Sequence, residues 1–347
     1  MADQLLTEDE AVALLLQTMP ELSLMAVPTV SVQKGGLLNH VLKIECGQRA
    51  WFLKQYLDKN VSSVFAPPPN PKADRAELAY QVQMMAHRYA PELVPQVWLD
   101  EVSFTLIVEG IANPRELIHY FAAGELRKPA LVQMAQVLGH LHQQTFNRPI
   151  CAEPPYRNEA FRDYKLGLQY DQIAAQMDRV TAAAIRDLAA RYREQQFCVL
   201  HGDPNSRNVI LNQTTGRVGI IDFEQSHVGN PVYDLAYILS EVCISGLFFQ
   251  RPDLGEVVAA FLDEYLRVFK AAQAVPGFYA DLAQHLAVQM IYRFLGPSKA
   301  AWTFYIPDSS DREAMVQAAS TLCEQGCIDG SIGLEEAIAV LRASYNP

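Results

Sequence analysis

At 347 residues the chain is long enough for two or three compact units, and a hydrophobic content of 50% with 19% charged residues is ordinary for a globular protein. Its 39 acidic and 28 basic residues give a formal net charge of −11, which argues against a nucleic-acid partner because phosphate contacts require the opposite excess. The sequence has no bilayer-length apolar run and no basic-flanked leader, and its six cysteines are scattered, so we expect no membrane partner, no cysteine-bound metal and a cytoplasmic location. It carries no signal of its oligomeric state.

The first third of the chain is predicted to form a strand-rich unit. Thr7 and Glu10 have the spacing of a helix capping box ahead of the apolar residues 11–16. The prolines of residues 65–71 predict an extended loop, and a helix opens at Asp74. Alternating apolar residues predict about five strands, at 30–33, 41–46, 50–56, 94–99 and 104–109.

From residue 111 onward the pattern changes to helices. Apolar residues recur at helical spacing in the segments 131–146, 182–192, 231–240, 254–270, 279–294, 311–324 and 334–343. A hairpin signal interrupts them, because residues 209–212 and 217–221 are apolar runs on either side of a Thr/Gly turn. We therefore expect an α+β fold with two lobes, a small mixed N-terminal lobe (1–110) with an antiparallel sheet and a larger, mainly helical C-terminal lobe (111–347).

Polar residues gather at the two ends of this hairpin. Asp203 and Asn208 precede its first strand and Asp222 follows its second, so the folded hairpin should bring the three side chains together. Caps of turns and helices would explain each residue alone, but not their convergence. A second interpretation is a hydrolytic transition-metal site with His201 as a ligand, although a third protein ligand is not evident.

The third interpretation is phosphoryl transfer. Mg²⁺ prefers oxygen ligands and usually takes one or two carboxylates together with substrate phosphates, a set that Asn208 and Asp222 can supply. Asp203 would then accept the proton of an attacking hydroxyl.

The N-terminal unit offers further parts of such a site. Gly35 and Gly36 precede the first strand pair and could let the backbone approach a phosphate, while a plain turn explains them equally well alone. Lys54 lies in the strand 50–56, where a lysine is usually a solvated edge residue unless a phosphate needs its charge. Glu77 has two open interpretations, a capping box with Asp74 or an ion pair with Lys54.

Taken together, these motifs resemble a known enzyme family. Asp203 and Asn208 have the spacing of a protein kinase catalytic loop. Residues 201–203, 221–224 and 229–236, however, resemble the aminoglycoside phosphotransferase and choline kinase superfamily, which has a protein-kinase-like fold. The resemblance implies that Asp203 is the catalytic base and that Asn208 and Asp222 hold Mg²⁺.

The same resemblance implies an ATP site and two supporting residues. The ATP site would comprise a phosphate-binding lysine, its helix partner, a glycine pair over the phosphates and a hinge whose backbone receives adenine: Lys54, Glu77, Gly35 and Gly36, and Val108, Glu109 and Gly110. His201 and Asp234 would support the catalytic loop structurally rather than contact substrate.

Several segments also resemble methylthioribose kinase. They are residues 36–39, 53–55 and 222–224, together with the late helix residues 290–296 that would carry an arginine pair for the sugar. Tyr292 stands where the first arginine is expected, and Asn208 is present where that enzyme departs from the general motif. Glu224 and Arg293 are therefore candidate substrate contacts, although Arg293 could instead pair with an acidic neighbour.

From these residues we predict an ATP- and Mg²⁺-dependent kinase that phosphorylates a hydroxyl of a small polar molecule, for example a sugar such as methylthioribose. The alternatives are a kinase of aminoglycosides, choline-like compounds or amino sugars, and a non-catalytic nucleotide-binding pseudokinase. The intact set of Lys54, Asp203, Asn208 and Asp222 argues against a pseudokinase.

Overall fold

A computed structural model describes residues 4–20, 22, 27–33, 39–58, 71–329 and 333–346, without the side chains of residues 326–329. The expected glycine pair, Gly35 and Gly36, lies outside the described residues, as does the expected proline loop up to residue 70. Within these ranges, no helix combines the length and the apolar character that crossing a membrane would require.

The N-terminal region contains the predicted antiparallel sheet of five strands, and the structure shows their order to be β1-β2-β3-β5-β4. Its strands are β1 (Thr29–Val32), β2 (Asn39–Cys46), β3 (Arg49–Tyr56), β4 (Val97–Asp100) and β5 (Thr105–Glu109). Helix α1 (Glu8–Thr18) begins with the expected capping box, in which Thr7 and Glu10 satisfy each other's backbone N–H groups.

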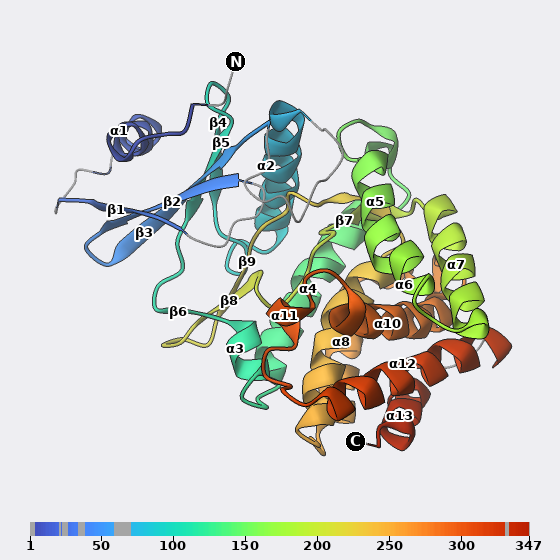
Figure 1. Ribbon diagram of the computed structural model, residues 1–347. Helices are drawn as coiled ribbons and strands as arrows, with labels where there is room; N and C mark the ends of the chain where they lie inside the picture. The colour runs from blue at the N-terminus through green and yellow to red at the C-terminus, as the bar shows by residue number, and fades with distance from the viewer. Residues whose placement is uncertain are drawn as a thin grey trace.

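The two faces of this sheet are covered by different helices. Leu42, Trp51 and Leu53 pack with α1 in one apolar cluster. Because side chains alternate along a strand, Lys54 and Tyr56 point to the other face, where Tyr56 packs against α2 (Lys72–Tyr89). Figure 1 shows α1 and α2 on opposite sides of the blue strands. The alternation therefore directs Lys54 away from α1.

The remainder of the chain is mainly helical, with short strands around the predicted hairpin. Strand β8 (Val209–Asn212) pairs with β9 (Val218–Ile220) on one side and with β6 (Pro114–Glu116) on the other. Strand β7 (Cys198–Leu200) pairs with β10 (His227–Gly229). The hairpin prediction is confirmed, whereas β6 was not predicted because three residues that include a proline give no alternating signal.

The helices of this region agree with the predicted periodic segments and add shorter ones. The long helices are α4 (Lys128–Thr145), α7 (Arg179–Glu194), α8 (Val232–Phe248), α9 (Leu254–Val268), α10 (Phe278–Leu295), α12 (Ser309–Asp329) and α13 (Leu334–Ser344). The short ones are α3 (Leu117–Phe121), α5 (Glu159–Leu166), α6 (Gln172–Ala174) and α11 (Lys299–Trp302), with a π-helical turn at Gly167–Asp171 between α5 and α6.

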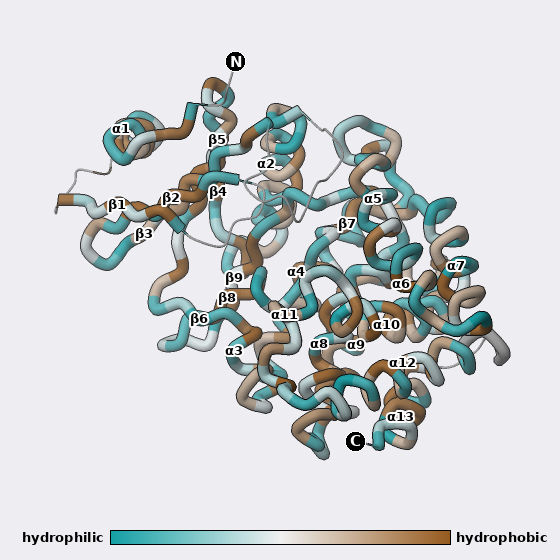
Figure 2. The backbone as a smooth tube through the Cα atoms, in the orientation of Figure 1, coloured by the Kyte–Doolittle hydropathy of each residue, from teal (hydrophilic) through white to brown (hydrophobic). Residues whose placement is uncertain are grey.

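Helix α8 is the centre of the helical core. Its residues from Val232 to Leu247 are buried, and it packs against α9, α10 and α13. Figure 2 shows hydrophobic stretches along α8 and along β2 of the sheet. A helix buried on all sides cannot shift without disturbing its neighbours, so the residues attached to α8 are held at fixed positions.

Candidate active site

Lys54 meets the end of the predicted hairpin. Its Nζ lies 2.5 Å from Asp222 Oδ1 and 3.2 Å from Glu224 Oε2, and only 16% of its side chain is exposed. Burial works against the ammonium charge, but the two carboxylates outweigh burial and raise the pKa of Lys54 above its ordinary value. The lysine is therefore a permanent positive charge beside Asp222.

Glu224 is tied into a buried polar chain. Asn39 donates to its Oε2 at 2.5 Å, and Arg75 of α2 donates to Asn39 Oδ1 at 2.6 Å. Burial raises the pKa of Glu224, although Lys54 opposes the rise. The contact of Glu224 with substrate stays a prediction, and the structure shows its carboxylate linking the hairpin exit to β2 and α2.

Both interpretations of Glu77 are wrong in this structure. The Glu77 side chain is exposed and accepts a hydrogen bond from Gln81, one turn further along the helix, at 2.5 Å. Helix α2 begins at Lys72 with Pro71 at its N-cap and no side-chain cap, so Asp74 and Glu77 form no capping box. Arg75, two residues earlier, faces inward instead, because helix positions two apart point in different directions.

The loop that follows β7 is held from behind by Asp234 of α8. His201 N and Gly202 N donate to the Asp234 carboxylate at 2.7 and 3.1 Å, and His142 Nε2 lies 3.2 Å from it. Gly202 has φ +81°, and a Cβ at this position would collide with the carbonyl oxygen of Gln225. A glycine is therefore required immediately before Asp203.

His201 uses both ring nitrogens within the protein. Its Nε2 donates to the Ile221 carbonyl at 3.0 Å, and its Nδ1 accepts from Asp203 N at 3.3 Å. The Ile221 carbonyl fixes the Nε2-protonated tautomer, and burial lowers the pKa of the ring. A neutral histidine with no free lone pair cannot bind a metal, so the hydrolytic transition-metal interpretation has no support.

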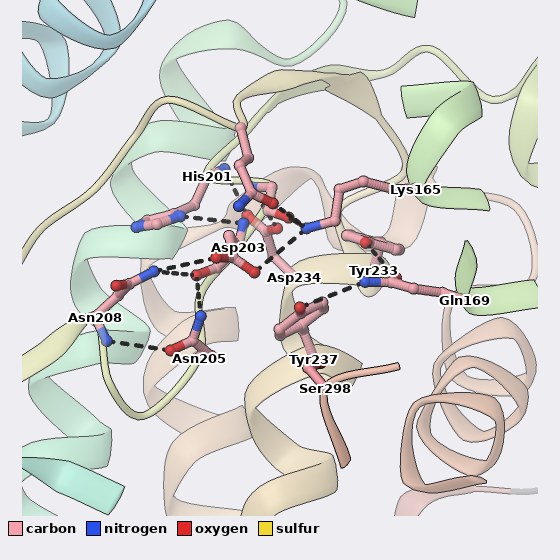
Figure 3. Close-up of polar contacts among 12 residues, drawn as sticks. Lys165, Gln169, His201, Asp203, Asn205, Asn208, Tyr233, Asp234, Tyr237 and Ser298 are labelled. Atoms are coloured by element: carbon pink, nitrogen blue, oxygen red, sulfur yellow. Dashed lines mark hydrogen bonds and ion pairs between the residues drawn. The ribbon is translucent and has the colours of Figure 1, made fainter. Parts of the chain in front are cut away.

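The Asp203 carboxylate lies between an amide and a lysine (Figure 3). Asn208 Nδ2 donates to Asp203 Oδ2 at 3.3 Å and to its carbonyl oxygen at 2.9 Å. Lys165 Nζ lies 3.3 Å from Asp203 Oδ1 and also donates to the Gly202 carbonyl and to Gln225 Oε1. Burial favours the neutral acid, but Lys165 and the Tyr237 hydroxyl, with His201 and Arg293 further away, together outweigh burial, and the pKa of Asp203 falls below its ordinary value.

The hairpin brings Asp222 back to this loop, as its sequence predicted. Ile221 N donates to the Asn208 carbonyl at 3.0 Å, which places the two predicted metal ligands on adjoining backbone segments. Asp222 has φ +71°, a left-handed conformation that a non-glycine residue adopts at a cost of about 1–3 kcal/mol and that is concentrated at functional sites. This backbone conformation aims the carboxylate at Lys54.

The donor set around Asp222 suits Mg²⁺ better than a transition metal. The Asn208 amide nitrogen is used by Asp203, so its Oδ1 remains as an acceptor in the cavity that the Asp222 carboxylate also lines. Among the described residues no group of three or more His, Cys, Asp and Glu side chains could hold a metal ion. Mg²⁺ tolerates such a sparse set because it keeps waters and takes its other ligands from substrate phosphates.

The predicted hinge lies at the end of β5, but its N–H groups are already used. Glu109 N donates to the Gln96 carbonyl at 3.1 Å, and Gly110 N donates to the Ala50 carbonyl at 2.8 Å. The Glu109 carboxylate lies 3.2 Å from Arg49. An adenine bound here would find these two N–H groups already occupied, and the role of Val108 to Gly110 stays a prediction.

The expectation that Arg293 contacts substrate is not supported. Arg293 is fully buried in α10 and its Nη2 lies 2.8 Å from Glu241 Oε1 of α8. Its guanidinium is also stacked over Tyr237 and Trp302, at 4.3 and 4.5 Å from their ring centroids. The alternative, a pair with an acidic neighbour, is the arrangement observed.

Many of the residues described above line one cavity of about 710 Å³, large enough for a nucleotide and a small second molecule. Its lining includes the predicted Lys54, Val108, Glu109, Gly110, Asp203, Asn208, Asp222 and Glu224. It also includes residues that were not predicted, on α5 and the π-helical turn (Lys165 and Gln169), on α8 (Tyr237) and near α11 (Ser298 and Trp302). Lys165 lies between two predicted helices, in a segment whose helical pattern of apolar residues extends over too few residues to predict a helix.

A cavity with a lysine from an antiparallel sheet and an Asp–Asn–Asp set from a mainly helical region is the arrangement expected of a phosphotransferase with a protein-kinase-like fold. The sequence profile of the phosphotransferase enzyme family (APH) matches residues 29–279, and the chain belongs to this family. A search of curated proteins finds no match.

Solved structures agree on the fold. A choline/ethanolamine kinase family protein from Mesorhizobium loti is 18% identical with a TM-score of 0.50, covering 96% of this chain and 99% of that one. A choline kinase from Cryptosporidium parvum Iowa II is 13% identical with a TM-score of 0.55, covering 98% and 100%. Amicoumacin kinase hAmiN, in complex with AMP-PNP, Ca²⁺ and Ami, is 15% identical with a TM-score of 0.50, covering 92% and 96%.

Proposed function

We propose that this protein is an ATP- and Mg²⁺-dependent kinase that transfers a phosphoryl group to a hydroxyl of a small polar molecule. One observation carries the proposal: Lys54, Asp203, Asn208 and Asp222 come from three separate stretches of sequence and line the same cavity. Neither the capping of turns nor a metal-hydrolase site requires a lysine from the sheet opposite these three residues.

Asp203 is proposed to accept the proton of the acceptor hydroxyl. A carboxylate with a lowered pKa is ionised at neutral pH, although it is a weaker base than one tuned near pH 7. Phosphoryl transfer through a loose transition state demands little proton removal before the O–P bond forms, so aiming the hydroxyl is the larger contribution. The contacts of Asp203 with Asn208 and Lys165 fix that aim.

The nucleotide is proposed to lie between the sheet and the hairpin. Asn208 and Asp222 would hold Mg²⁺, which neutralises charge on the phosphates, and Lys54 would contact the phosphates from β3. The AMP-PNP and Ca²⁺ in the amicoumacin kinase complex support this use of a nucleotide with a divalent ion. We place the boundary between the two lobes at residues 110 and 111, where β5 has ended and the chain passes to β6.

The test is a screen of small hydroxyl compounds, methylthioribose among them, for ADP release with Mg-ATP. On any active compound, Asp203→Asn should lower kcat by roughly 10²–10⁴-fold while calorimetry shows unchanged Mg-ATP binding. Asp163→Asn, on exposed α5 surface, is the matched control. Full turnover by Asp203→Asn would refute the base assignment, and absence of Mg²⁺-dependent nucleotide binding in the wild type would refute the kinase assignment.

A further inference from the structure

One side of Asp203 is formed by a set of residues that we call the acceptor wall: Lys165, Arg207, Tyr237, Tyr292, Ser298 and Trp302, all of which line the cavity. Figure 3 shows Lys165, Tyr237 and Ser298 on the side of Asp203 away from Asn208. Because Asn208 and Asp222 form the proposed metal side, a hydroxyl presented to Asp203 would come from a molecule against this wall.

Aromatic rings in such a wall could receive an ammonium group by cation–π contact. Here, however, the protein's own cations already contact them. The Arg293 guanidinium lies 4.3 Å from the Tyr237 centroid, 4.5 Å from Trp302 and 5.9 Å from Tyr292. Arg293 is fully buried, paired with Glu241 and absent from the cavity lining, so it occupies these rings from the protein interior.

Two more cations lie on the wall itself. Lys165 Nζ is 4.8 Å from the Tyr237 centroid, and the Arg207 guanidinium is 5.5 Å from Trp302, where Arg207 also donates to the Ala301 carbonyl at 3.0 Å. Each ring of the wall thus faces at least one positive charge of the protein. A positively charged acceptor would therefore have to compete with these cations for the ring faces that an open aromatic cage would offer it.

Most of the described carboxylates that line the cavity are already paired with a lysine or an arginine. Asp203, the carboxylate nearest to it, is paired with Lys165 at 3.3 Å. Of the other described carboxylates that line the cavity, Asp222 and Glu224 lie against Lys54 and Glu109 against Arg49. Glu116 lies 4.0 Å from His119. Four of these five carboxylates already have a lysine or arginine partner, so an ammonium group at the wall would lose its hydration and compete with the protein's own cations for a carboxylate.

We propose that the acceptor is a hydroxyl compound without an ammonium group, a neutral or acidic polyol that rests on the Tyr237 and Trp302 side of the cavity. The proposal rests on the proposed kinase function and sets this chain apart from a kinase of choline or of an aminoglycoside. Ser298 and Arg207 supply hydrogen-bonding groups that suit hydroxyl and carboxylate oxygens.

The experiment compares acceptors that differ only in charge. The active compound from the ADP-release screen is assayed with and without an ammonium group, alongside choline against 3,3-dimethylbutan-1-ol and an aminoglycoside against its N-acetylated form. We expect kcat/KM to be at least about tenfold higher for the ammonium-free member, a ratio that one uncompensated charge at close range readily produces. A wild-type preference for the ammonium-bearing members would overturn the proposal and leave the kinase assignment intact.

A charge reversal locates the effect. Arg207→Glu should raise kcat/KM of ammonium-bearing acceptors relative to their ammonium-free partners by several-fold. Arg186→Glu is the control, because Arg186 is exposed on α7, lies outside the cavity lining and changes the net charge by the same amount. If both variants change the ratio equally, the selectivity comes from net charge and the acceptor wall has no part in it.

Discussion

Replacing Arg293 with methionine tests whether this arginine stabilises the fold or binds substrate. Arg293 and Glu241 have 0% and 3% of their side chains exposed and are 2.8 Å apart. Within the described structure the Nε and Nη1 of Arg293 have no hydrogen-bond partner, so few bonds are lost with the side chain itself. The main consequence is that Glu241 remains as a buried carboxylate with Ser206 as its hydrogen-bond donor.

The size of the effect depends on the proton that Glu241 must take up. Burial already raises the pKa of Glu241 beside Arg293, and without Arg293 the folded state holds the neutral acid. Protonating a glutamate of unfolded pKa about 4.3 at pH 7 costs about 1.4 kcal/mol per pH unit, a ceiling of roughly 3.7 kcal/mol. The folded state then binds more protons than the unfolded state, so Arg293→Met should lose stability as pH rises from about 4.3 to 7.

Urea unfolding of the wild type and Arg293→Met, at about pH 5 and pH 7, measures this slope. Arg293→Met/Glu241→Met should recover most of the loss because it leaves no unpaired charge. Arg191→Met, which breaks a part-exposed contact with Asp281 at 3.3 Å, should cost about 1 kcal/mol or less. A pH-independent loss in Arg293→Met, or a double variant no more stable than the single one, would contradict the reasoning.

Three further outcomes are expected at the site. Glu77→Gln should leave the KM for ATP unchanged, since Glu77 is exposed and not paired with Lys54. A tenfold rise in this KM would instead support a kinase-type ion pair between Glu77 and Lys54. Lys54→Met should raise that KM by at least about tenfold as a charge-assisted phosphate contact is lost, while Lys43→Met, on β2 and paired with Glu45, should not. Lys165→Met should move the acidic limb of the kcat/KM profile to higher pH, because Asp203 then loses the strongest of the interactions that lower its pKa against burial. Lys165→Arg should keep the wild-type limb, and identical profiles in all three proteins would disprove the coupling.

The sequence carried enough information for the loop and hairpin because these features are local. Asp203, Asn208 and Asp222 lie at the ends of one short hairpin, and turn residues with alternating apolar runs specify such a unit. The direction of the Lys54 side chain was likewise predictable, because strand alternation determines the face of the sheet on which it lies.

The predictions that failed depended on contacts between distant segments. The direction of Glu77 depends on where α2 begins, and a shift of two residues from Asp74 to Lys72 turns a different residue inward. Arg293 was predicted to contact substrate because the local sequence around a helical arginine is the same in both cases. It does not show whether the arginine faces a cavity or a buried glutamate 52 residues away. Local pattern cannot distinguish these cases.

The π-helical turn at Gly167–Asp171 has a consequence for how this family could change acceptors. A π-helical turn holds one residue more than an α-helical turn of the same rise, so it rotates the helix on its N-terminal side relative to the helix on its C-terminal side by about 100°. Lys165 precedes the turn, and Gln169 within it donates to Tyr237 Oη at 3.4 Å. Loss of a single residue here, for instance at Gly167, would change the direction of Lys165 relative to Gln169 and Tyr237, and so reshape one side of the cavity without any change in the sequence of the catalytic loop. The choice of acceptor in such a chain can therefore evolve through insertion or deletion of a residue in this turn as well as through substitution.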